Sequence, residues 1–111
     1  MLRLGMPYEV TFLEIAGAQD KADPNASVIF RFEIFNGLEK THADVALTQR
    51  GLEIIEKGGK DPTSAARIVL DRLLRSGRDP FESHIFLQVP YGHAAYFSKN
   101  GNYNALPVLS D

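Results

Sequence analysis

The sequence contains no cysteine, and this absence removes several kinds of chemistry at once. Without a thiol the chain has no disulfide bonds, no thiolate ligands for a metal and no cysteine nucleophile. No apolar run approaches the roughly 18 residues that cross a bilayer, and residues 1–7 lack the apolar core of a signal peptide. These absences predict a cytoplasmic protein that has no membrane partner.

The chain also has no excess of basic charge. It carries 12 Lys and Arg residues against 14 Asp and Glu residues, which gives a formal net charge of -2. Indiscriminate binding to nucleic acid usually depends on a basic surplus, so the composition argues against it. No phosphate-binding loop, dinucleotide-binding fingerprint or Gly-x-Ser-x-Gly elbow is present. We therefore expect no NTPase, Rossmann or α/β-hydrolase chemistry and no cofactor.

The chain does have enough apolar content for one compact domain. Its 111 residues are 44% hydrophobic, which suffices for one core, while the length is too short for two independent cores. No linker and no internal repeat divides the sequence. Residues 1–111 are therefore predicted to form a single small domain.

Alternating apolar residues predict three strands in the first half of the chain. They cover residues 8–15, 27–35 and 40–47, with an exposed loop at residues 17–26. The Asn36-Gly37 dipeptide between the second and third strands is typical of a tight hairpin, so these two strands should be antiparallel. The apolar face of the second strand is predicted to contain Val28, Phe30, Phe32 and Ile34.

Two helices are predicted next. Thr48 is a suitable N-cap for a short helix that runs to about Lys57. Asp61 caps a second and longer helix, with Pro62 at its first position and Gly77 as its terminator. The apolar residues of the longer helix recur at the spacing of one helix face, which should pack against a sheet. They are Ala66, Val69, Leu70, Leu73 and Leu74.

The last third of the chain is predicted to return to strands. Residues 84–89 alternate in polarity, and a turn at residues 90–93 is predicted to lead into another strand at residues 94–99. Asn100-Gly101 indicates a further hairpin into residues 103–106. The core element order is therefore β-β-β-α-α-β-β. Helices in the middle of a hairpin-rich chain favour an α+β fold, in which an antiparallel sheet of about five strands carries both helices on one face.

The longer helix has a basic face. Residues 62–78 carry a local charge of +3, which leaves -5 for the rest of the chain. The favoured interpretation is a solvated face on which Asp71 pairs with neighbouring arginines. The alternative is a phosphate-contacting surface of a nucleic-acid-binding module, assisted by Lys99 and Tyr91. The arginines concerned are Arg67, Arg72, Arg75 and Arg78.

Ile68 lies nearly opposite the apolar stripe, among these arginines. An aliphatic residue within a charged rim resembles the centre of a small protein interface. The alternative is a single exposed apolar residue, or one that is covered by the loop after Gly77. Both interpretations are kept.

Three histidines and an aspartate form another candidate site. His42 and Asp44 are two residues apart on one strand, so their side chains should share a face. A carboxylate beside an imidazole can orient it for acid–base work. His84 and His93 would join them if their strands pair suitably. Because no HExxH or comparable ligand spacing occurs, we expect no structural metal.

No motif in the sequence identifies an activity. The best-supported prediction is a small binding domain that associates with itself or with another protein, through an exposed strand edge or the surface around Ile68. Open sheets leave unpaired edges, and a homodimer is the commonest closed oligomer. Two alternatives are kept, namely a nucleic-acid-binding module that uses the arginines and a small hydrolase or metal-dependent enzyme that uses the His/Asp cluster.

Overall fold

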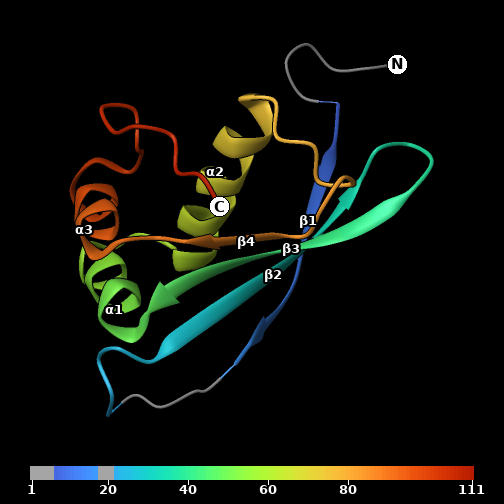
Figure 1. Cartoon of the computed structure of the whole chain (residues 1–111). Helices are drawn as coiled ribbons and strands as arrows, with labels where there is room; N and C mark the ends of the chain where they lie inside the picture. The colour runs from blue at the N-terminus through green and yellow to red at the C-terminus, as the bar shows by residue number, and fades with distance from the viewer. Residues whose placement is uncertain (1–6, 18–21) are drawn as a thin grey trace.

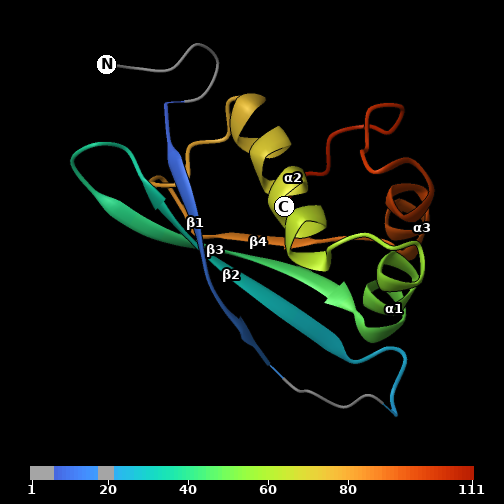
Figure 2. The same ribbon diagram turned by 180° about the vertical axis from the view of Figure 1, so that it is seen from behind.

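The computed structural model describes residues 7–17 and 22–111 and has the α+β architecture that the sequence predicts. Within this described part, a four-stranded sheet carries three helices. Figures 1 and 2 show all three helices on the same side of the sheet. The elements in chain order are β1 (Glu9–Ala16), β2 (Ser27–Phe35), β3 (Lys40–Thr48), α1 (Gln49–Lys57), α2 (Pro62–Arg75), β4 (Ile85–Gln88) and α3 (Tyr91–Asn100).

The strands lie in the order β1-β2-β3-β4, so β1 and β4 form the two edges of the sheet. β2 and β3 are antiparallel, as the hairpin signal predicts. In their connection the Asn36 side chain accepts hydrogen bonds from the backbone N–H groups of Leu38 and Glu39, at 2.9 and 2.7 Å. Gly37 adopts a φ of 98°, which side chains disfavour. β1 pairs antiparallel with β2, with a register shift between Phe12 and Glu14.

Both predicted helices are present with their predicted caps. The Thr48 hydroxyl accepts a hydrogen bond from the Gly51 N–H at 3.0 Å, at the start of α1. The Asp61 carboxylate accepts one from the Ser64 N–H at 3.3 Å, at the start of α2. Beyond the last turn of α2, Gly77 adopts a φ of 106°. Local capping chemistry therefore determines where these helices begin and end.

The longer helix packs its apolar stripe on the sheet, as predicted. Val69, Leu70 and Leu73 are buried in one cluster with Phe30 and Phe32 of β2. Side chains from β4 and from the residue that follows it complete this cluster, so the core lies between the sheet and the helices. They are Ile85, Leu87 and Val89.

The prediction of a strand at residues 94–99 was wrong, because this segment forms the body of α3. Ala94, Phe97 and Ser98 are buried at the three- and four-residue spacing of a helix face. Gly101 adopts a φ of 72° and donates a hydrogen bond to the Phe97 carbonyl oxygen at 2.8 Å. The Asn100-Gly101 pair therefore ends a helix and does not turn a hairpin.

The expected strand at residues 103–106 is also absent from the described part of the chain. The Leu106 N–H donates to the Tyr103 carbonyl oxygen at 2.9 Å, which forms a turn. The Tyr103 side chain is fully buried, and its hydroxyl donates to the Ala65 carbonyl oxygen at 3.2 Å. Burial raises the pKa of this hydroxyl above its usual value. Tyr103 thus anchors the segment after α3 against α2.

The sheet is mixed and not wholly antiparallel, because β4 runs parallel to β3. The prediction treated β4 as part of another hairpin. Parallel neighbours need a crossover connection, and α1 and α2 provide it. They return the chain to the end of the sheet at which β3 begins, so that β4 can run in the same direction as β3. The strand itself is correctly predicted, with bounds of Ile85–Gln88.

Two further expectations fall partly outside the described residues. Of the predicted loop at residues 17–26, residues 18–21 are not described, while the Ala26 N–H donates to the Asp23 carbonyl oxygen at 3.1 Å in a turn. The signal-peptide prediction rests mainly on residues 1–6, which are also not described. No helix among the described residues has both the length and the apolar character needed to span a bilayer.

Candidate functional site

None of the described helices packs on the opposite face of the sheet (Figures 1 and 2). Charged side chains form ion pairs there. Because Phe30 and Phe32 point into the core, the alternation of a strand directs Arg31 and Glu33 to the opposite face. Asp44 pairs with Arg31 in the register of β2 and β3, so it lies on this face too. We call this surface the helix-free face.

A row of ion pairs crosses the helix-free face. The Arg31 Nε donates to Asp44 Oδ1 at 3.0 Å, and its Nη1 contacts Glu14 Oε2 at 3.4 Å. The His84 Nε2 lies 3.3 Å from the second oxygen of Asp44. Asp44 is only 7% exposed, so partners on both sides compensate the burial of its charge.

This row joins two of the four residues in the predicted His/Asp cluster. Asp44 and His84 are in contact, while His42 is exposed on the same face, in register with Glu33. His93 lies on α3, across the sheet from them, with its ring centroid 6.2 Å from that of Tyr103. In the described part of the chain, no group of three or more His, Cys, Asp or Glu residues is placed to hold a metal.

The Asp44–His84 contact can perform limited chemistry. A carboxylate at one ring nitrogen orients the imidazole and leaves the other nitrogen to face a ligand. The His84 side chain is 54% exposed, so the imidazole is accessible from solvent. The pair is therefore able to exchange a proton with a bound molecule.

The basic face of α2 is largely engaged within the molecule. The Arg67 guanidinium donates to the Val10 carbonyl oxygen and lies over the Phe32 ring, 5.6 Å from its centroid. The Arg72 Nη2 donates to the Leu106 carbonyl oxygen at 2.7 Å. These two guanidinium groups bind backbone atoms, which restricts their freedom to contact a phosphate.

The other members of the predicted interaction surface differ in exposure. Arg75 is exposed, whereas Ile68 is partly buried and packs against the core. Asp71 is half-buried, and its Oδ1 has no hydrogen-bond partner among the described residues. Burial raises the pKa of the Asp71 carboxyl, although the nearby Arg67 and Arg75 oppose this shift. A carboxylate in this position is costly to the fold.

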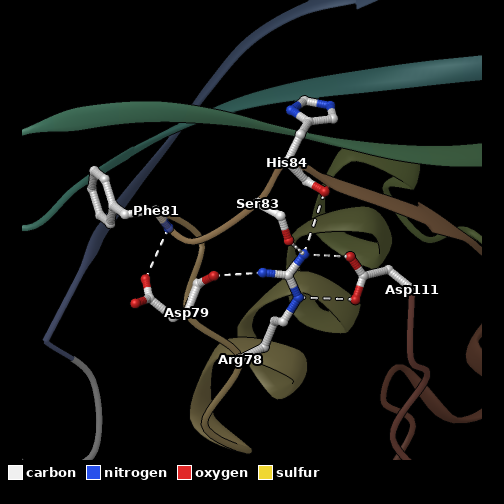
Figure 3. Close-up of polar contacts among 6 residues, drawn as sticks. All are labelled: Arg78, Asp79, Phe81, Ser83, His84 and Asp111. Carbon is white, nitrogen blue, oxygen red and sulfur yellow. Dashed lines mark hydrogen bonds and ion pairs between the residues drawn. The ribbon is translucent and has the colours of Figure 1, made fainter.

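Arg78 forms a clamp on the C-terminal segment, as Figure 3 shows. Its Nε and Nη2 donate to the two carboxylate oxygens of Asp111, at 3.1 and 2.8 Å. Its remaining bonds reach the Asp79 carbonyl oxygen, the Ser83 hydroxyl and the His84 carbonyl oxygen. The hydrogen bond with Arg78 lowers the pKa of the Asp111 carboxyl. The clamp therefore ties the segment after α3 to the start of β4.

The outer edge of β4 presents unpaired backbone groups. The Val89 N–H donates to the Ala46 carbonyl oxygen at 2.9 Å. This bond shows which residues of the β4 segment direct their backbone groups toward β3 in the parallel pairing. Because alternate residues of a strand bond to the same neighbour, Phe86 and Gln88 direct their N–H and C=O groups away from β3. No described residue forms a further hydrogen bond with these groups.

A groove of about 630 Å³ lies beside this edge. It extends over the ends of β3 and β4 and is bounded on one side by the last residues of the chain. Phe86 is 40% exposed, so the groove offers apolar surface next to unpaired backbone groups. The residues that line it include Phe86, Gln88, Tyr91, Leu109 and Asp111.

Sequence reasoning did not identify Arg31, Glu14 or the β4 edge as parts of a site. One signal for Arg31 was available, because a hairpin that pairs Phe35 with Lys40 also pairs Arg31 with Asp44. The β4 edge could not be found in this way, since its position depends on the crossover.

Comparison of the chain with protein-family models, with curated proteins and with solved structures found no match.

Proposed function

We propose that this protein is a protein-interaction domain that binds an extended segment of a partner by adding it to the free edge of β4. The observation that carries the proposal is the outward direction of the Phe86 and Gln88 backbone groups beside an open groove. In strand addition, backbone hydrogen bonds supply affinity, and pockets for alternate side chains supply specificity. The β4 edge offers both elements.

The opposite edge of the sheet is a weaker candidate. β1 contains a register shift between Phe12 and Glu14, and such irregularities disrupt pairing with a further strand. The Val10 carbonyl oxygen of β1 also already accepts a hydrogen bond from the Arg67 guanidinium. β4 has neither obstacle over its four residues.

The experiment selects peptides from a displayed library of random linear sequences on the wild-type protein. Selected peptides are then measured against Gln88→Pro and Gln88→Ala. Proline removes only an outward N–H and spares the ladder to β3, while alanine keeps that N–H. We expect binding to Gln88→Pro to be at least about tenfold weaker, which corresponds to one lost hydrogen bond of about 1.4 kcal/mol, and binding to Gln88→Ala to be retained.

Two results would contradict the proposal. One is that no peptide is enriched on the wild-type protein. The other is that enriched peptides bind Gln88→Pro as tightly as Gln88→Ala, with both variants folded by circular dichroism.

A second candidate function is acid–base catalysis at His84, which the 3.3 Å contact with the buried Asp44 favours. Its test is hydrolysis of chromogenic ester and phosphate substrates by the wild-type protein and by His84→Gln. A rate that requires His84 and follows the titration of one imidazole would support catalysis. Equal rates for the two proteins would remove this candidate.

A further inference from the structure

The helix-free face has a regular pattern of side chains along β2. Arg31 and Glu33 have opposite charge and lie on either side of Phe32, whose own side chain points into the core. Two residues beyond each charge, Ile29 and Phe35 place half-buried apolar side chains on the same face. Along β2 in either direction from Phe32, the helix-free face therefore carries first a charged residue and then an apolar residue. The two charged residues have opposite signs.

We infer that the helix-free face is the interface of a homodimer, in which two copies pack face to face about a two-fold axis that passes over β2 at the level of Phe32. Such an axis lies between the two sheets and perpendicular to the strands. It brings Arg31 of one copy opposite Glu33 of the second copy, and it repeats this contact on its other side. The same rotation places Ile29 opposite Phe35, so apolar groups meet apolar groups.

The register of β3 extends this match. Glu33 is paired with His42, and Arg31 is paired with Asp44. The axis at the level of Phe32 therefore places His42 of one copy opposite Asp44 of the second copy. Facing sheets are rotated by about 30° because of their twist. Facing side chains of the two copies are consequently closest near the axis and farther apart at the sheet edges.

The two central charges keep groups available for a second copy. Arg31 uses Nε and Nη1 for Asp44 and Glu14, and its Nη2 has no partner among the described residues. The Glu33 carboxylate has one longer ion pair, to Lys40 at 3.8 Å. Their side chains are 36% and 27% exposed, so both are accessible on the face.

A second copy of the chain is the occupant that this pattern fits. The face carries both charge signs in an arrangement that is complementary to itself under one rotation, whereas a partner of a single charge sign would be attracted by one half and repelled by the other. The inference goes beyond strand addition at the β4 edge, because its centre at β2 lies two strands away.

The test measures solution mass by sedimentation equilibrium for the wild-type protein, Arg31→Glu, Glu33→Arg and an equimolar mixture of the two variants. We expect twice the mass of the 12.3 kDa chain for the wild type. Each variant alone sets like charges opposite each other twice, and its dimer should dissociate at least about a hundredfold more readily. In the mixture every contact regains opposite charges, so a heterodimer should form.

Controls separate the interface from the fold and from the β4 edge. Arg75→Glu reverses an exposed charge on α2 and should keep the wild-type mass. Gln88→Pro should also remain dimeric, which makes failure here distinguishable from failure of strand addition. Because Arg31 also pairs with Asp44, its loss can unfold the chain. Ile29→Asp supplies a second variant that leaves all of these ion pairs in place, and it should be monomeric.

A monomeric wild-type protein at about 100 µM, above the dissociation constant expected for a stable interface, would overturn the inference. Arg31→Glu and Glu33→Arg proteins that each stay dimeric alone would overturn it as well. The inference would also be overturned if Arg31→Glu and Glu33→Arg are folded but form no heterodimer in the mixture, and Ile29→Asp keeps the wild-type mass.

Discussion

Gly58 approaches Ser98 so closely that no side chain fits between them. A Cβ atom placed on Gly58 would lie 2.2 Å from the Ser98 Oγ and 2.4 Å from its carbonyl oxygen. The same Oγ donates a hydrogen bond to the Ile54 carbonyl oxygen at 2.7 Å. The missing side chain at the end of α1 therefore allows α3 to lie directly against it.

We predict that Gly58→Ala destabilises the protein by about 1–3 kcal/mol, the usual cost of overpacking. Gly58 has a φ of -78°, so the effect comes from the contact with Ser98 and not from backbone strain. Chemical denaturation measures the change. Gly92→Ala is the matched control, because its Cβ would meet nothing within 4 Å. If both variants unfold like the wild type, the packing of α3 on α1 is incorrect.

The packing of α2 on the sheet predicts that Leu73→Ala costs about 2–5 kcal/mol in the free energy of unfolding. Leu73 is 4% exposed and lies in the core cluster. Leu38→Ala, on a residue that is 90% exposed in the β2–β3 connection, should change stability by less than about 0.5 kcal/mol. Equal effects for these two leucine truncations in urea titrations would contradict the assignment of the core.

Asp71 provides a prediction about pH. Its pKa is higher in the folded state than in the unfolded state, so the folded state binds more protons between these two values. Its contribution to stability therefore falls as pH rises through that window. Asp71→Asn removes the buried charge and should stabilise the protein at pH 7, while the difference from the wild type shrinks below the unfolded pKa. A variant that is less stable at pH 7 would show that the Asp71 charge is favourable.

The Arg78–Asp111 clamp predicts the opposite dependence. The pKa of Asp111 is lower in the folded state, so its contribution to stability is present above the unfolded pKa and is lost as pH falls through the folded value. Asp111→Asn should destabilise the protein at pH 7 by about 0.2–1 kcal/mol. The loss should vanish in acid. Thermal unfolding across pH measures both, and a pH-independent loss would mean that Asp111 acts through packing.

The elements that the sequence predicts correctly are those with local signals. Asp61 and Pro62 identify the start of α2, and Asn36-Gly37 identifies the β2–β3 hairpin. The same local logic misread Asn100-Gly101, because a glycine with positive φ ends a helix as readily as it turns a hairpin. Only the packing of Ala94 and Phe97 resolves that ambiguity.

The candidate site was less accessible to prediction, because it depends on pairing between distant strands. The Asp44–His84 contact joins residues 40 positions apart and requires β4 to lie parallel beside β3. No local signal specifies that arrangement. For the arginines of α2, the local spacing along the helix was predictable, but their partners were not. Arg67 and Arg72 bind backbone carbonyl groups of segments distant in the sequence.

The availability of the β4 edge is tested most directly by amide hydrogen exchange, residue by residue, on the wild-type protein with and without a peptide selected from the library. We predict fast exchange at Phe86 and Gln88 and slow exchange at Leu87 and Val89 in the free protein, because only the latter two direct their N–H groups to β3. The added peptide should slow Phe86 and Gln88. Equal protection of all four amides in the free protein, or no change at Phe86 and Gln88 when the peptide binds, would contradict strand addition at this edge.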